Sequence, residues 1–168
     1  MTARKVMLLG EIGVGKSSIV QRLVFDRFDM TYKPTIGVDV YRYDVPPHGT
    51  QDKSTLIVWD TDGNFGDTIF RHVYMKEASA AIIVSDLSRP QTLDHAARLA
   101  EGFVAAMPGR HVALILNKID LVEDPGALAM PAVFTTPGRS LYRTSAKTGA
   151  NVQTVFHDCA DIITRRSA

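Results

Sequence analysis

The stretch Gly10-Glu-Ile-Gly-Val-Gly-Lys-Ser17 decides how the rest of the chain is interpreted. It follows an apolar run, Val6–Leu9, and precedes a segment with helical spacing, Ser18–Phe25. The pattern G-x-x-x-x-G-K-[ST] between a strand and a helix is typical of a loop whose backbone N–H groups bind phosphates. Its lysine reaches the terminal phosphates, its serine hydroxyl binds Mg²⁺, and the helix N-terminus adds a positive dipole end. The sequence therefore predicts a nucleotide phosphate site at residues 10–18.

The composition is that of an ordinary globular protein. The chain has 168 residues, 45% of them hydrophobic and 22% charged, which suits one domain with a substantial core. Its formal net charge of +1 provides no field that would attract nucleic acid. A single cysteine excludes an intrachain disulfide and suits a reducing compartment. We therefore expect a single domain over residues 1–168, cytoplasmic and monomeric, with no nucleic acid as partner.

Signals for membrane attachment are missing from the sequence. No apolar stretch reaches the length of a membrane span, and the N-terminus lacks the apolar core of a signal peptide. Thr2 stands where myristoylation needs glycine, and the last residues, Arg165–Ala168, include no cysteine for prenylation. We expect no direct lipid anchor. The protein then works in the cytoplasm, reaches membranes through a partner, or lacks a C-terminal tail.

Apolar runs without clean alternation predict strands that are covered on both faces of a parallel sheet. These runs are Lys5–Leu9, Thr55–Asp60, Ala80–Asp86 and His111–Asn117. Val38–Val45 mixes charged residues with valine and tyrosine, so we expect an exposed edge strand that forms a hairpin with Thr55–Asp60. Leu141–Thr144 is a candidate for a short last strand.

Helical spacing of apolar residues separates these strands. It is found in Gln91–Met107 and again from Val152 to Ile163, where Cys159 lies in the apolar stripe and is expected to be a packed core thiol. Three prolines and two glycines in Glu123–Gly138 predict a short or irregular helix there. The alternation of strands and helices predicts a doubly wound α/β fold, in which ligands bind at the carboxyl ends of the strands.

Polar motifs stand at several of these strand ends. Asp60-Thr-Asp-Gly63 offers a carboxylate to Mg²⁺ and a glycine N–H to a γ-phosphate, although a plain turn explains it equally well. In Asn117-Lys-Ile-Asp120, the carboxylate would accept two hydrogen bonds from guanine, whereas adenine would leave it unpaired. The apolar stem of Lys118 would lie along the base plane.

Two further segments are weak signals when taken alone. Thr144-Ser-Ala-Lys147 would supply a backbone N–H to the guanine oxygen. In Tyr32–Gly37, the Thr35 hydroxyl would be a second Mg²⁺ ligand. By itself the tetrapeptide is close to uninformative, and in isolation a polar turn with proline is the better explanation of Tyr32–Gly37.

Together these five segments occur in one order, and the chain resembles the Ras-like small GTPases over nearly its whole length. The resemblance implies a three-layer G domain of the P-loop NTPase type. It has a mostly parallel six-stranded sheet with one antiparallel edge strand and helices on both faces. It also implies GTP and GDP as ligands, Mg²⁺ as cofactor, and two switch loops that order around the γ-phosphate. Effectors, an exchange factor and an activating protein would contact residues 30–45 and 62–76.

The resemblance also assigns roles to individual residues. Metal ligands would be Ser17, Thr35 and Asp60, and hydrolysis would use Lys16, Thr35, Gly63 and Asn64. Phe28 would pack against the base, with a core phenylalanine as the alternative. The implied nucleotide-binding residues are Gly10, Glu11, Ile12, Gly13, Val14, Gly15, Lys16, Ser17, Ser18, Phe28, Tyr32, Thr35, Gly63, Asn117, Lys118, Asp120, Ser145, Ala146 and Lys147.

The chain departs from the family pattern near the γ-phosphate. Asn64 replaces the glutamine that orients the attacking water, and its arm is one methylene shorter, so we expect slow intrinsic hydrolysis. Ile12 would crowd an arginine inserted by an activating protein. Either the activator works differently or an arginine is supplied in cis, with Arg42 and Arg71 as candidates unless they are surface cations. Asp62 either repels the γ-phosphate or points away and accepts local hydrogen bonds.

The five histidines show no metal-ligand spacing, and we expect all of them on the surface or in helices.

The leading hypothesis for function is a GTP/GDP switch. The alternative is a hydrolysis-deficient scaffold that stays bound to nucleotide. A nucleotide or metabolite kinase shares the phosphate loop, but the segment Asn117–Asp120 argues against it.

Overall fold

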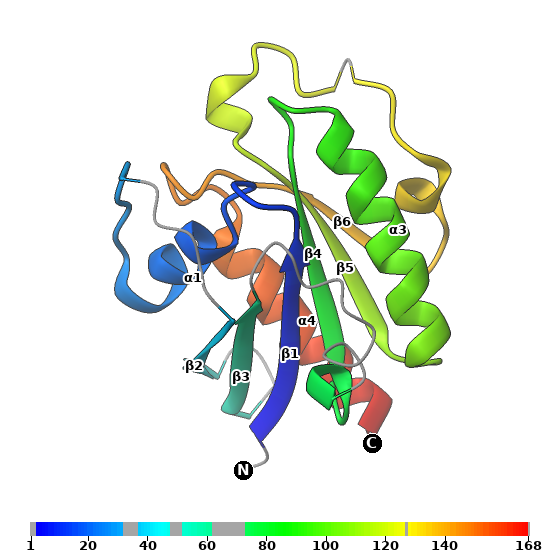
Figure 1. The fold of residues 1–168 in the computed structure, drawn as a ribbon. Helices are drawn as coiled ribbons and strands as arrows, with labels where there is room; N and C mark the ends of the chain where they lie inside the picture. The colour runs from blue at the N-terminus through cyan, green and yellow to red at the C-terminus, as the bar shows by residue number, and fades with distance from the viewer. Residues whose placement is uncertain (1–2, 32–36, 48–51, 62–72, 127, 168) are drawn as a thin grey trace.

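The structure is a computed structural model that describes residues 3–31, 37–47, 52–61, 73–126 and 128–167. One sheet of six strands has the order β2-β3-β1-β4-β5-β6 (Figure 1). Its strands are β1 (Ala3–Gly10), β2 (Val38–Val45), β3 (Ser54–Thr61), β4 (Ala80–Asp86), β5 (His111–Asn117) and β6 (Ser140–Arg143). β2 runs antiparallel to β3, and every other neighbouring pair is parallel. The predicted mostly parallel sheet with one antiparallel edge strand is confirmed.

Helices cover both faces of this sheet. α1 (Lys16–Phe25) and α4 (Val152–Ser167) lie on one face, and α3 (Gln91–Ala106) lies on the other, as Figure 1 shows. Two short 3₁₀ turns are present, η1 (Ile119–Leu121) and η2 (Ala132–Thr135). Among the described residues of 123–138, η2 is the sole helical turn, which confirms the expected irregular segment.

The apolar runs are explained by the two covered faces. In β1, Val6 and Leu8 pack toward α1 and α4, whereas Met7 and Leu9 pack toward α3. The central strands β4 and β5 divide their apolar side chains between the same two clusters. Because successive side chains of a strand point to opposite faces, a strand buried on both sides needs apolar residues at every position.

The apolar stripe of α4 closes one of these clusters. Val155, Phe156 and Cys159 are all fully buried in it. Burial raises the pKa of the Cys159 thiol to about 12, so the thiol stays protonated at neutral pH. The expectation of a packed core thiol is confirmed.

One histidine contradicts the expectation that all five lie on the surface or in helices. His111 is the first residue of β5 and is only 2% exposed. It is also the first residue of the predicted run His111–Asn117, and its pairing with Ala80 in the sheet accounts for the burial of its ring. His95 lies in α3, and His157 in α4 forms a 2.8 Å hydrogen bond between its Nε2 and the Tyr43 hydroxyl.

His48 and His72 are outside the described residues. In the part of the chain that the structure describes, no group of three or more histidine, cysteine or acidic residues could hold a metal ion. No helix in that same part has the length and apolar character needed to cross a membrane.

Candidate nucleotide site

The loop between β1 and α1 needs glycine at two of its positions. Gly15 has a φ of 102°, and a Cβ on it would collide with the Asn117 amide. A Cβ on Gly10 would lie 2.5 Å from the carbonyl oxygen of Val84. Any larger residue would push the loop away from β4 and β5. The sequence motif therefore encodes a close approach of this loop to the neighbouring strands.

Lys16 lies at the first turn of α1 and folds back over this loop. Its side chain is nearly buried, and its Nζ donates hydrogen bonds to the carbonyl oxygens of Gly10, at 2.8 Å, and Glu11, at 3.0 Å. The two contacts hold the ammonium group against the backbone of the loop. A cation there, together with the N–H groups of the helix N-terminus, provides a site for phosphate.

The side chains predicted to hold a metal ion meet beside Lys16. Ser17 Oγ donates a 2.6 Å hydrogen bond to Oδ2 of Asp60, which is 0% exposed near the end of β3. A hydroxyl and a carboxylate are the oxygen ligands that Mg²⁺ accepts. The chemistry of this pair therefore fits the Mg²⁺ site that the sequence predicts at Ser17 and Asp60.

The two motifs predicted for guanine lie against each other and against the phosphate loop. Asn117, at the end of β5, donates from Nδ2 to the carbonyl oxygen of Val14 at 3.0 Å and accepts a 2.9 Å hydrogen bond from Thr144 Oγ1. Asp120 accepts a 2.7 Å hydrogen bond from Ser145 Oγ. The segments 117–120 and 144–147 are far apart in the sequence, but they lie together and form one wall of the candidate site. This is the arrangement expected for ligand-binding loops at the carboxyl ends of parallel strands.

Lys118 joins this wall to the phosphate loop. Its backbone is left-handed, with a φ of 66°, and its Nζ donates to the carbonyl oxygen of Gly13 at 2.8 Å. The same nitrogen forms a 2.9 Å ion pair with Oδ2 of Asp86. The lysine therefore bridges the loop, β5 and the end of β4.

Sequence reasoning missed Asp86, whose carboxylate binds several of the side chains beside the phosphate loop. Its carboxylate is 1% exposed, and Oδ1 accepts hydrogen bonds from the backbone N–H and hydroxyl of Ser88, at 2.8 and 2.6 Å. Burial disfavours the ionised form, but the hydrogen bonds from Ser88 and Lys118 hold the pKa of Asp86 below its usual value. Asp86 ends an apolar strand just as Asn117 does, and that shared position was a signal that could have found it.

Two arginines were also missed. Arg89 donates from Nη2 to the carbonyl oxygen of Ile12 at 2.8 Å, and its Nε lies 3.2 Å from Oδ2 of Asp86. Arg22 of α1 donates from Nε to the carbonyl oxygen of Ala146 at 2.9 Å and from Nη2 to that of Lys147. Neither arginine belongs to a recognisable motif, because its contacts with the candidate site are to backbone carbonyl groups of distant segments.

Several other predicted residues are placed less tightly. Phe28 is half-buried and packs against the core cluster that includes α1. Arg42 pairs with Asp44 at 3.1 Å on the exposed side of β2, which favours a surface cation. Ala146 is buried and Lys147 is exposed. The predicted residues that lie outside the described part of the chain are Tyr32, Thr35, Asp62, Gly63, Asn64 and Arg71.

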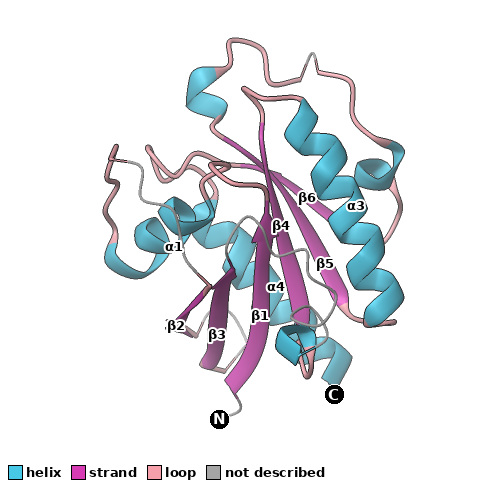
Figure 2. Ribbon diagram, viewed as in Figure 1, coloured by secondary structure: helices cyan, strands magenta, loops and turns pink. Residues whose placement is uncertain are grey.

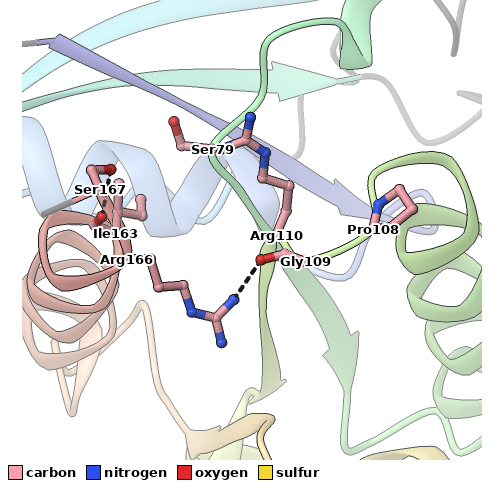
Figure 3. Close-up of a pocket in the computed structure, with 7 residues that line it drawn as sticks. All are labelled: Ser79, Pro108, Gly109, Arg110, Ile163, Arg166 and Ser167. Atoms are coloured by element: carbon pink, nitrogen blue, oxygen red, sulfur yellow. Dashed lines mark hydrogen bonds between the residues drawn. The ribbon is translucent and has the colours of Figure 1, made fainter.

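All of the contacts above lie at one end of the sheet. Figure 2 shows the loops that follow β1, β4, β5 and β6 gathered there. A pocket of about 250 Å³ lies at the opposite end, next to the starts of β4 and β5 (Figure 3). Its lining includes Ser79, Arg110 and Arg166, and none of the predicted motifs reaches it. The chemistry that the sequence predicts therefore belongs to the loop end of the sheet.

Comparison with known proteins agrees with this arrangement. A family model described as "Ras family" matches residues 5–165. The chain is 32% identical over 164 residues to the Ras-related protein RABF2a of Arabidopsis thaliana, covering 96% of this chain and 81% of that protein. It is 32% identical over 160 residues to the GTP-binding protein ypt5 of Schizosaccharomyces pombe, covering 91% and 74%. It is 33% identical over 155 residues to the human Ras-related protein Rab-22A, covering 90% and 79%.

Proposed function

Because this chain belongs to the Ras family of small GTPases, we propose that it is a GTP/GDP switch that hydrolyses GTP slowly. The proposed unit is one G domain over residues 1–168. The observation that carries the proposal is the meeting of Lys16, the Ser17–Asp60 pair and the Asp120–Ser145 pair at one end of the sheet. The proposed phosphate cradle, metal site and base site would therefore lie in one place.

In the proposed site, one set of residues binds the phosphates and another set holds the metal ion. The backbone N–H groups of residues 10–18 would bind the phosphates, and Lys16 would contribute its charge at the terminal ones. Ser17 and Asp60 would hold Mg²⁺ together with Thr35. When bound, Mg²⁺ neutralises charge between the last two phosphates. The buried Asp60 carboxylate already faces the Ser17 hydroxyl, so little rearrangement of these two side chains is needed.

The base part of the site supports guanine. Asp120 is exposed at the wall formed with Ser145, where its carboxylate would accept two hydrogen bonds from the guanine edge. Asn117 holds this wall to the loop through Val14, and Lys118 would cover the base plane with its stem. The adenine of ATP would not supply these two hydrogen bonds, so a strong preference for guanine nucleotides is expected.

Partners would contact the segments beside the γ-phosphate, residues 30–45 and 62–76. In the described part of the first segment, Met30 and Val40 are 79% and 53% exposed. The cytoplasm is the proposed compartment, because the lone thiol, Cys159, suits a reducing environment.

A single-turnover experiment tests the proposed activity. The purified protein is loaded with GTP and Mg²⁺, and phosphate release is followed over hours, with ATP as the competitor nucleotide. Slow but complete phosphate release, with bound GTP that excess ATP does not displace, supports the switch. GTP recovered intact favours the alternative, a nucleotide-bound scaffold, and displacement by ATP contradicts the assignment of the base site.

The substitution Asn64→Gln tests the explanation for slow hydrolysis. We expect the single-turnover rate to rise about ten-fold or more, because the longer amide reaches the attacking water. Affinity for GDP should stay the same, since Asn64 is not assigned to the base or to the metal. An unchanged rate with unchanged affinity would show that water positioning by this side chain does not limit hydrolysis.

A further inference from the structure

Arg89 touches the phosphate loop from outside. It lies in the turn between β4 and α3, and its Nη2 donates to the carbonyl oxygen of Ile12 at 2.8 Å. A Cβ on Gly13 would lie 3.3 Å from the same nitrogen, so the guanidinium is packed against the loop backbone.

Asp86 fixes both the backbone and the side chain of Arg89. Arg89 donates its own backbone N–H to the carbonyl oxygen of Asp86 at 2.9 Å, and its Nε pairs with the Asp86 carboxylate at 3.2 Å. Ser88 is tied to the same carboxylate. Since Asp86 is buried at the end of β4, the guanidinium approaches the loop from a rigid support.

Lys118 completes a pair of contacts on consecutive carbonyl groups. Arg89 binds the carbonyl oxygen of Ile12, Lys118 binds that of Gly13, and both cations share Oδ2 of Asp86. In a trans peptide the C=O and N–H point in opposite directions. Holding the Ile12 carbonyl outward therefore turns the Gly13 N–H toward the other side of the loop, where phosphate is expected.

We propose that Arg89 is a positioning residue that clamps the phosphate loop through the Ile12 carbonyl and slows the release of bound nucleotide. The inference rests on the proposed function, since it assumes that the loop holds a guanine nucleotide. The clamp has two parts, a fixed peptide orientation and a positive charge next to an anion-binding loop.

Release of a fluorescent GDP derivative tests the clamp. Wild type, Arg89→Ala, Arg89→Lys and Arg98→Ala are loaded with the derivative and Mg²⁺, and release is followed after adding excess GDP. Arg98 is an exposed arginine of α3 and serves as the matched control. We expect Arg89→Ala to release GDP about ten-fold faster, which corresponds to about 1.4 kcal/mol. Arg89→Lys should recover part of the effect because it keeps the charge and a donor.

A second measurement does not depend on nucleotide. Hydrogen exchange at the Gly13 amide is compared in the nucleotide-free proteins, and we expect faster exchange in Arg89→Ala than in Arg98→Ala. Equal exchange in the two variants, or equal GDP release by wild type and Arg89→Ala, would overturn the clamp. A wild-type protein that binds no guanine nucleotide would instead overturn the proposed function, while the exchange comparison still decides the clamp.

Discussion

The two ends of the sheet bury polar groups in opposite ways. At the loop end, the Asp86 carboxylate receives hydrogen bonds or ion pairs from Ser88, Arg89 and Lys118. At the other end, His111 is equally buried, but neither ring nitrogen has a hydrogen-bond partner among the described residues. Burial, with a smaller contribution from Arg166, lowers the pKa of His111 to about 4.

The difference shows what partners do for a buried ionisable group. Hydrogen bonds keep the pKa of Asp86 low, so the group stays charged and orders two cations around the phosphate loop. His111 has no such partners, so it gives up its charge and acts as a neutral ring in the core. The charged Asp86 supports the candidate site, whereas the neutral His111 lowers the stability of the folded protein in acid.

Removal of the Asp86 carboxylate should have the largest effect. We expect Asp86→Ala to lose about 3 kcal/mol of unfolding free energy, because Lys118, Arg89 and the Ser88 turn lose a shared acceptor. Urea denaturation measures this loss, with Asp94→Ala, an exposed acid of α3, as control. GDP release should also be faster than in Arg89→Ala. A loss within about 0.5 kcal/mol of the control would mean that the carboxylate does not stabilise the fold.

The pH dependence of stability tests the opposite end. The unfolded chain binds the His111 proton near pH 6.5 and the folded chain near 4, so stability is lost as the pH falls between these values. At pH 5 this contributes about 2 kcal/mol of destabilisation relative to pH 7. Urea denaturation at both pH values should show that His111→Leu loses less stability than wild type by this amount.

The control for this measurement is His95→Leu, because His95 lies in α3 and is not fully buried. It should retain most of the acid sensitivity of wild type. If His111→Leu and wild type lose equal stability between pH 7 and 5, the ring is not held neutral by burial.

The smallest effect concerns Arg166. Its charge contributes to the low pKa of His111, and its Nη1 donates to the carbonyl oxygen of Gly109 at 3.0 Å. We expect Arg166→Met to raise the His111 pKa by less than about one unit, since the guanidinium is exposed and screened. A proton NMR titration of the imidazole measures the shift. A lower pKa in the variant would contradict the assigned repulsion.

Much of the fold is predictable from the sequence because local pattern and burial agree. The bounds of β2, β4 and β5 match the predicted runs residue for residue. β1 extends beyond its predicted run, to Ala3 and Gly10, because backbone pairing with β3 and β4 does not need apolar side chains. The meeting of the Asn117–Asp120 and Thr144–Lys147 motifs follows from the rule for strand ends.

Other contacts depend on geometry that no motif records. Arg89 reaches Ile12 because β1 and β4 are neighbours in the sheet, although the two residues are far apart in sequence. His111 looks like a polar residue at the edge of an apolar run, and only the pairing of β5 with β4 explains its burial. The roles assigned to Thr35, Gly63 and Asn64 stay predictions.

The continuous apolar runs also have a consequence for misfolding. A strand that is apolar at every position would still bury apolar side chains after slipping by one residue, so hydrophobicity alone gives little protection against slippage. The polar ends provide that protection. A slip of β4 or β5 would draw Asp86 or Asn117 into an apolar layer and strip them of their partners. Residues of the candidate nucleotide site thus also keep the strands in register.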